Sequence, residues 1–117
     1  DSIVRSVIIE TRSAWEQIDQ ILAVDDLDMV YLGVYDMSVA LGFPGQVGHP
    51  EIERFVTDVT KRARKAGKFV GAMSLKSVDA AKLVDSGVQF VVQAVDSQLI
   101  SSSAKSLRDA FPARGSK

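Results

Sequence analysis

The sequence contains no cysteine, which excludes disulfide bonds, a thiolate nucleophile and metal sites built on cysteine. Acidic and basic residues almost balance, at a net charge of −1, so the charge indicates neither a nucleic-acid-binding surface nor an anionic-membrane surface. No apolar run approaches the ~20 residues needed to cross a bilayer. The amino-terminal apolar stretch is too short, and too interrupted by charge, for a signal peptide. We therefore expect a cytoplasmic protein without nucleic-acid or membrane partners.

The composition is that of an ordinary globular protein, with 46% hydrophobic and 25% charged residues. A chain of this length buries roughly two-thirds of the surface that it exposes when unfolded, which is enough for one core. We expect a single domain over residues 1–117. Because the chain lacks an initiator Met and starts abruptly before an apolar strand, we expect a fragment or a truncated gene product.

Four similar units follow one another, each an apolar stretch and then a segment with helical spacing of its apolar residues. Strands are expected at residues 3–9, 28–34, 69–75 and 90–95. Helices are expected over 11–24, from Pro50 to a stop at Gly67, from a Ser77 cap to Gly87, and from Asp96 or Ser97 to about Phe111. In the third helix, Val78, Ala81 and Val84 should face the core. A frayed tail at 112–117 and a long Gly- and Pro-rich loop before Pro50 complete the chain.

Strands that alternate with helices indicate an α/β fold with βαβ units, a parallel sheet and right-handed crossovers. The strands are apolar on both faces, so we expect both faces to be covered. Two architectures fit: an open α/β sheet, or half of a (β/α)8 TIM barrel. A half-barrel would leave two apolar edges, which a second copy or a missing segment would have to cover.

Two carboxylates follow neighbouring strands of the predicted sheet. Glu10 comes directly after the first strand, and Asp36 lies two residues after the second. Neighbouring parallel strands are about 4.8 Å apart, and sites in such sheets gather at the carboxyl ends of the strands. A hard divalent ion such as Mg²⁺ or Mn²⁺ would relieve the repulsion between the two carboxylates. The alternative is that both residues cap the helices that follow, and the pattern alone favours capping.

Other conspicuous residues have structural explanations. His49, the only histidine, directly precedes Pro50 at a helix start, so a loop or capping role is favoured over a ligand or base. Trp15 keeps helical spacing with Ile18 and should belong to the core. The basic run at 61–65 should be a solvated helix face. The loop before Pro50 contains no nucleotide-binding pattern.

The combination of IET, G-x-x-D-x-S-x-x-LG, PG and HPE at these spacings resembles the carboxyl-terminal half of the HpcH/HpaI aldolase and citrate lyase family. The later segments RKAGK and GVQFVVQAVDSQLI also fit this family. Its members are (β/α)8 barrels and include 4-hydroxy-2-oxoheptanedioate aldolase and 2-dehydro-3-deoxyglucarate aldolase. The resemblance therefore implies the half-barrel architecture.

The resemblance also implies roles for individual residues. Glu10 and Asp36 fall on the family's metal ligands, and the backbone amides of Tyr35 and Asp36 would hold the carboxylate of pyruvate. Gly33 would let the backbone approach the substrate closely. The metal would act as a Lewis acid that stabilises a pyruvate enolate. The implied function is a divalent-metal-dependent aldolase, a carbon–carbon lyase of 2-oxo acids, in a homo-oligomer whose rim meets a neighbouring subunit.

The chain departs from the family pattern at three residues and lacks part of the site. Ile8 stands where the pattern has Gln, and Val34-Tyr35 stands where it has Pro-Ala. Tyr35 would narrow the pocket or touch substrate with its hydroxyl. The family's catalytic His and substrate-binding Arg come from the amino-terminal half of the barrel, and His49 does not replace that His. We assign no catalytic residue and expect the chain alone to be a weak or inactive aldolase.

Two further hypotheses stay open. The first is a catalytically incomplete half-barrel that assembles with a second copy or a complementary chain, in a structural or binding role. The second is a binding module with an open α/β sheet, which would bind 2-oxo acids without a metal.

Overall fold

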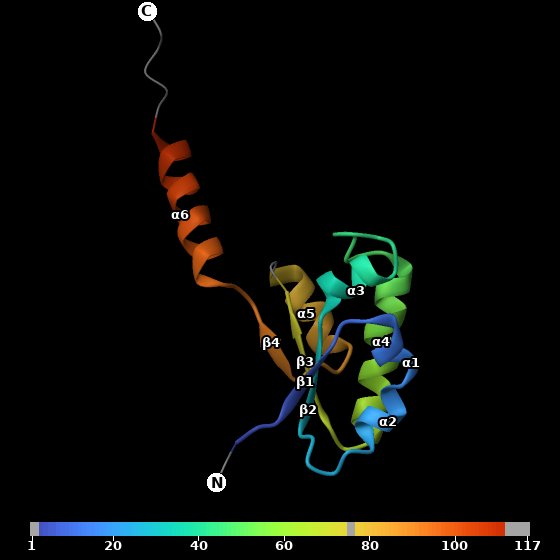
Figure 1. Cartoon of the computed structure of the whole chain (residues 1–117). Helices are drawn as coiled ribbons and strands as arrows, with labels where there is room; N and C mark the ends of the chain where they lie inside the picture. The colour runs from blue at the N-terminus through green and yellow to red at the C-terminus, as the bar shows by residue number, and fades with distance from the viewer. Residues whose placement is uncertain (1–2, 75–76, 112–117) are drawn as a thin grey trace, which may run out of the picture.

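Residues 3–74 and 77–111 are described by a computed structural model of the chain, with the backbone alone for 77–79 (Figure 1). One parallel sheet contains, in spatial order, β1 (Ser6–Ile9), β2 (Met29–Leu32), β3 (Phe69–Met73) and β4 (Phe90–Val92). The predicted parallel sheet is confirmed, although each strand is shorter than its predicted range. At the first strand, Ile3 and Val4 are exposed and lie ahead of the first paired residue, Ser6.

Six helices occur in the described ranges: α1 (Arg12–Glu16), α2 (Ile18–Leu22), α3 (Val34–Ala40), α4 (Pro50–Lys65), α5 (Ser77–Asp85) and α6 (Asp96–Ala110). The boundaries predicted for α4 are confirmed, since it starts at Pro50 and is followed by Gly67 in the left-handed region at φ 74°. The single helix predicted over 11–24 is wrong, because Gln17 leaves helical geometry (φ −98°, ψ 16°) and separates α1 from α2. Helix α3 lies in the segment where the sequence predicted the end of a strand and a long loop, with a helix after Asp36 only as the capping alternative. None of these helices is long and apolar enough to cross a membrane.

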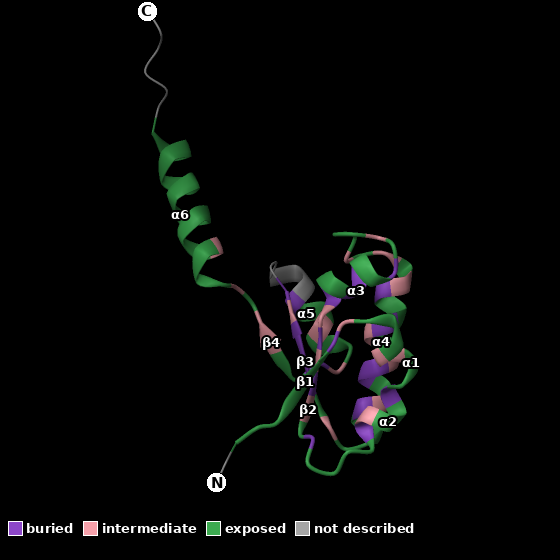
Figure 2. Cartoon of the chain, in the orientation of Figure 1, coloured by how far each residue is buried: buried purple, intermediate pink, exposed green. Residues whose placement is uncertain are grey.

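The core lies between the helices and one face of the sheet (Figure 2). Helix α4 contributes a fully buried stripe of Ile52, Phe55, Val59 and Ala63. The sheet contributes the alternate strand residues Ile9, Val30, Leu32, Val70 and Ala72. Full burial of one large apolar side chain contributes about 1.5–3 kcal/mol, so this layer dominates the stability of the fold. We call this face of the sheet the outer face.

The opposite face, the inner face, is open. Strand register aligns Ile8, Tyr31, Gly71 and Phe90 in one row across it. Ile8 is 57% exposed and Phe90 is 52% exposed. The prediction that both faces are covered is therefore wrong for the described part of the chain, where the helices pack on one face. Apolar residues on both faces indicate that both suit burial, but they do not say which segment covers each face.

Helices α5 and α6 form as predicted, but their packing differs from expectation. In α5, Ala80 and Leu83 pack towards the core, whereas Val84 is 58% exposed. The inward positions predicted there are wrong for Ala81 and Val84, and the Val78 side chain lies outside the described residues. Helix α6 forms as expected but extends away from the sheet (Figure 1). Its large apolar side chains are exposed. The tail at 112–117 also lies outside the described residues.

A polar network joins the first helices to α4. Trp15 packs edge-on against Phe55, with ring centroids 5.4 Å apart, and its indole N–H donates to Asp58 Oδ2 at 2.8 Å. Arg62 donates from Nε to Asp19 Oδ1 at 2.9 Å and from its NH1 to Asp58 at 3.2 Å. Trp15 is thus packed at the edge of the core rather than fully inside it. Arg62 is an exception to the predicted solvated face at 61–65, because it holds α2 against α4.

The Asp19–Arg62 pair predicts an acid-sensitive contribution to stability. The hydrogen bond from Arg62 holds the pKa of the Asp19 carboxyl below its ordinary value of 3.8. A lowered folded-state pKa stabilises the fold above that ordinary value, and the stabilisation disappears as the pH falls through the folded pKa. We expect Asp19→Asn to flatten the dependence of unfolding free energy on pH below about pH 4, measured by urea unfolding between pH 3 and 7. Asp25→Asn is the control, and equal slopes in the two variants would contradict the role of the pair.

Candidate functional site

The candidate site lies at the carboxyl ends of β1 and β2. Glu10 follows β1 directly, and Gly33 follows β2 and donates its N–H to Ile9 O at 3.0 Å. The Glu10 side chain is half-buried and lies against Gly33. Because strand residues alternate and Ile9 is buried on the outer face, Glu10 belongs to the inner face. The first predicted carboxylate therefore stands on the open side of the sheet.

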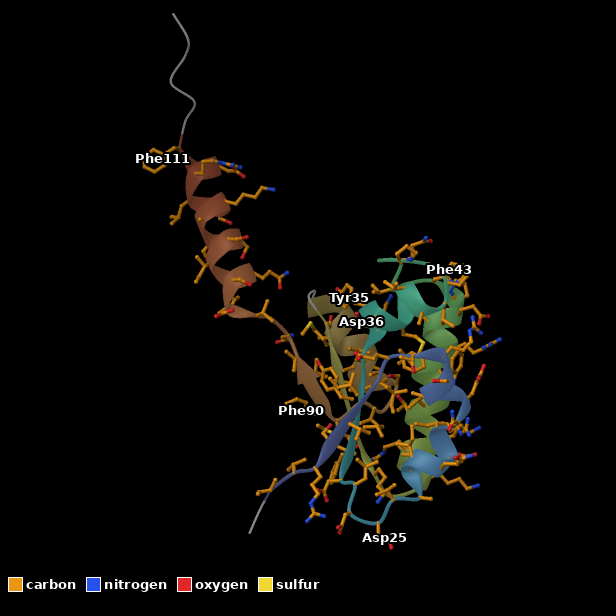
Figure 3. All side chains as sticks on the ribbon, viewed as in Figure 1. Asp25, Tyr35, Asp36, Phe43, Phe90 and Phe111 are labelled. Atoms are coloured by element: carbon orange, nitrogen blue, oxygen red, sulfur yellow. The ribbon has the colours of Figure 1, made fainter. Side chains whose placement is uncertain are left out.

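Asp36 and Tyr35 lie in the first turn of α3, which begins immediately after Gly33. The buried residues Val34, Met37 and Leu41 turn one side of α3 to the core, which leaves Tyr35 and Asp36 exposed. Figure 3 shows both at the end of the sheet opposite Asp25. The structure thus brings Glu10, Gly33, Tyr35 and Asp36 to one rim, as the sequence predicted for the ends of neighbouring strands.

Neither Glu10, just before α1, nor Asp36, in the first turn of α3, is the N-cap of that helix. Thr11, rather than Glu10, is the N-cap of α1, and its hydroxyl accepts a hydrogen bond from Ala14 N at 3.2 Å. Gly33 is the N-cap of α3, and no side chain makes a capping hydrogen bond to that helix. Asp36 still gains from the helix dipole in the first turn of α3, but its carboxylate oxygens serve no cap there.

The donor set at the rim suits a hard divalent ion with additional ligands. Within the described ranges, no group of three or more His, Cys, Asp or Glu side chains is arranged to hold a metal. Glu10, directly after β1, and Asp36, in the first turn of α3, offer oxygen donors, which Mg²⁺ and Mn²⁺ prefer. Mg²⁺ commonly keeps several waters or substrate oxygens beside one or two carboxylates. Glu10 and Asp36 offer donors of this kind, and their role as metal ligands stays a prediction.

Ser38 anchors the loop that follows the rim. It is fully buried, and its hydroxyl donates to Tyr35 O at 2.5 Å and accepts from Gly45 N at 2.9 Å. Its carbonyl accepts from Phe43 N at 2.7 Å. The sequence predicted no role for Ser38. The serine of the D-x-S pattern is the only sequence signal that pointed to it.

His49 completes the other end of this loop. Its Nδ1 accepts a hydrogen bond from Glu51 N at 3.2 Å, so the His49 side chain caps α4. Its ring also stacks on Phe43, with centroids 3.6 Å apart and planes 17° apart. The predicted loop and capping role of His49 is confirmed, and both contacts are structural.

A cavity of about 520 Å³ adjoins the rim on the helix side. Its lining includes Val34 and Tyr35 from α3, Glu53 from α4, Met73 from the end of β3, and Lys82 from α5. Tyr35 therefore contributes to the wall of this cavity. Its contact with a substrate stays a prediction.

A family model for HpcH/HpaI aldolase/citrate lyase matches residues 1–103. The chain belongs to this family. The 2-keto-3-deoxy-L-rhamnonate aldolase of Klebsiella pneumoniae subsp. pneumoniae is 36% identical over 99 residues, which cover 85% of this chain and 37% of that relative. The aldolase of the same name from Escherichia coli K12 is 36% identical over 101 residues, which cover 86% and 38%. The chain thus spans less than two fifths of the length of these relatives.

Solved structures agree with the family. The HpcH/HpaI aldolase from Desulfitobacterium hafniense DCB-2 matches with a TM-score of 0.86 and 29% identity, over 97% of this chain and 46% of that protein. Citrate synthase SbnG matches with a TM-score of 0.81 and 27% identity, over 92% of this chain and 44% of that protein. The predicted architecture is confirmed, since the four strand–helix units form part of the TIM-barrel fold of these proteins.

The buried hydroxyl of Ser38 yields a stability prediction. Ser38→Ala removes the acceptor of the Gly45 N–H and the donor to Tyr35 O, and we expect a loss of about 1–3 kcal/mol in unfolding free energy. Ser86→Ala is the matched control, because Ser86 is exposed and its hydroxyl also donates to a carbonyl three residues earlier, Leu83 O. We expect the control to change stability by less than about 0.5 kcal/mol. Urea unfolding of both variants measures this, and equal losses would contradict the anchoring role.

Proposed function

We propose that this chain carries the metal-binding part of a divalent-metal-dependent aldolase that acts on 2-oxo acids. The observation that carries the proposal is the placement of Glu10 and Asp36 at one rim, with neither engaged in capping, in a member of an aldolase family. Relatives whose names state 2-keto-3-deoxy-L-rhamnonate aldolase support a 2-oxo acid as the substrate class.

Each rim residue has a role in this proposal. Glu10 and Asp36 would hold Mg²⁺ or Mn²⁺. The bound ion would supply Lewis-acid stabilisation of the negative charge that develops on the oxo acid. The backbone N–H groups of Tyr35 and Asp36 lie in the first turn of α3, where such groups have no intrahelical acceptor, and they would bind the substrate carboxylate.

The proposal leaves proton transfer to groups outside the described rim. His49 is occupied as the α4 cap, so it does not serve as the acid or base. Positioned proton transfer contributes typically 10²–10⁴-fold to a rate. We therefore expect aldolase activity from an assembly that supplies this group, and weak activity or none from the chain alone. A cytoplasmic location belongs to the same proposal.

Metal binding tests the proposal directly. We expect the chain to bind Mn²⁺, and to bind it more tightly with pyruvate or oxalate present, because an oxo acid supplies further oxygen ligands. Asp36→Ala should weaken Mn²⁺ binding at least about tenfold, as measured by titration calorimetry, since one of two carboxylate ligands is lost.

The control is Asp25→Ala, which removes an exposed carboxylate at the opposite end of the sheet (Figure 3). It should bind Mn²⁺ like the unmodified chain. Equal weakening in both variants would indicate non-specific charge effects. An unmodified chain that is folded and binds no Mn²⁺ would reject the metal site.

A partner chain is the second part of the proposal, supported by two exposed apolar surfaces. One is the inner face of the sheet, and the other is the side of α6 that carries Ile100 and Leu107, with Phe111 directly after the helix. Burial of apolar area on association stabilises a complex by about 25 cal/mol for each Å² that leaves water. We propose that a second copy or a complementary half-barrel covers them.

The mass in solution tests this part. Light scattering on the purified chain should give a multiple of 12.7 kDa. Leu107→Glu, in the exposed helix, should shift the mass towards the monomer without unfolding the sheet, because it places a charge on one of the two surfaces. A monodisperse, folded monomer at all concentrations would reject self-association of this chain.

A further inference from the structure

Gly33 lies in contact with the Glu10 side chain. A Cβ placed on Gly33 would lie 2.6 Å from Glu10 Cβ, 3.1 Å from Glu10 Oε2 and 3.2 Å from Ile8 Cγ2. The space that a side chain would occupy at position 33 is therefore already taken by the stem and one carboxylate oxygen of Glu10.

The backbone conformation does not require glycine at this position. Gly33 has φ −80° and ψ 69°, which side-chain-bearing residues can adopt, unlike Gly42, Gly45, Gly67 and Gly87 with positive φ. The constraint on position 33 is the space that Glu10 fills. Ile8, on the same strand face as Glu10, closes a second side of that space.

We propose that Gly33 is a positioning residue for Glu10. Because Gly33 has no side chain, the Glu10 carboxylate can lie against the end of β2, directly before the helix α3 that contains Asp36. This role rests on the proposed metal site, and it differs from close approach of the Gly33 backbone to a substrate. The contact at 2.6 Å involves Glu10 Cβ, which is fixed to the backbone and cannot move by side-chain rotation. A methyl group at position 33 therefore forces the ends of β1 and β2 apart and displaces the carboxylate together with them.

Two other glycines provide matched controls. At Gly48 an added Cβ meets nothing within 4 Å, so Gly48→Ala adds a methyl group in open space. At Gly71 an added Cβ would lie 2.7 Å from Tyr31 Cδ2 and 3.3 Å from Phe90 Cδ1, so Gly71→Ala crowds the inner face away from Glu10. The first control tests the loss of a glycine, and the second tests crowding of the sheet.

The experiment is Mn²⁺ titration of the unmodified chain and the three alanine variants, each with its thermal midpoint. We expect Gly33→Ala to weaken Mn²⁺ binding about 10–100-fold, the range typical when a group that orients a metal ligand is changed. Gly48→Ala should retain both affinity and midpoint. Gly71→Ala should lower the midpoint and retain the affinity. If the role of Gly33 were purely structural, Gly33→Ala would give this same result.

Glu10→Asp extends the test to a variant without crowding at position 33. It withdraws the carboxylate by one methylene from the place beside Gly33, and we expect a similar loss of Mn²⁺ affinity. If Gly33→Ala does not fold, this variant decides. Unmodified affinity in Glu10→Asp or in folded Gly33→Ala would overturn the positioning role and leave the metal site in place. An unmodified chain without Mn²⁺ binding would instead reject the metal site itself.

Discussion

The packing of α4 on the outer face of the sheet is the interaction on which the rest of the structure depends. Phe55 and its neighbours along the stripe are fully buried in the core cluster that also contains residues of β2 and β3. The ends of α4 are fixed by polar contacts, with His49 capping its start and Arg62 joining it to α2. With α4 fixed, the loop between β2 and α4 has both ends held, and this loop contains α3 and Asp36.

The features that could be predicted from the sequence have local signals. Strand residues are β-branched and apolar, Pro50 suits the first position of a helix, and Gly67 takes the left-handed conformation that ends one. The rim location of Glu10 and Asp36 follows from strand ends alone, because parallel strands bring their carboxyl ends to one edge. Each of these inferences needs only a few neighbouring residues.

The features that could not be predicted depend on distant contacts. Helix α3 has no capping side chain and forms where Val34, Met37 and Leu41 enter the core. Loop anchoring by Ser38 depends on Gly45, seven residues away, folding back onto the same hydroxyl. The open inner face was mispredicted because apolar residues on both faces of a strand indicate that both faces suit burial, but they do not say which segment covers each face.

The site and the open face are coupled by strand alternation. Glu10 lies on the inner face two residues after Ile8, whose side chain is exposed there, so the same surface carries both a proposed ligand and uncovered apolar area. Any segment that covers this area also becomes a wall of the site and lowers the water content around Glu10. Exclusion of water strengthens electrostatic interactions at the rim, so assembly and metal chemistry would depend on each other. The outer face is already covered by α4, and this packing supports the rim that carries Glu10 and Asp36.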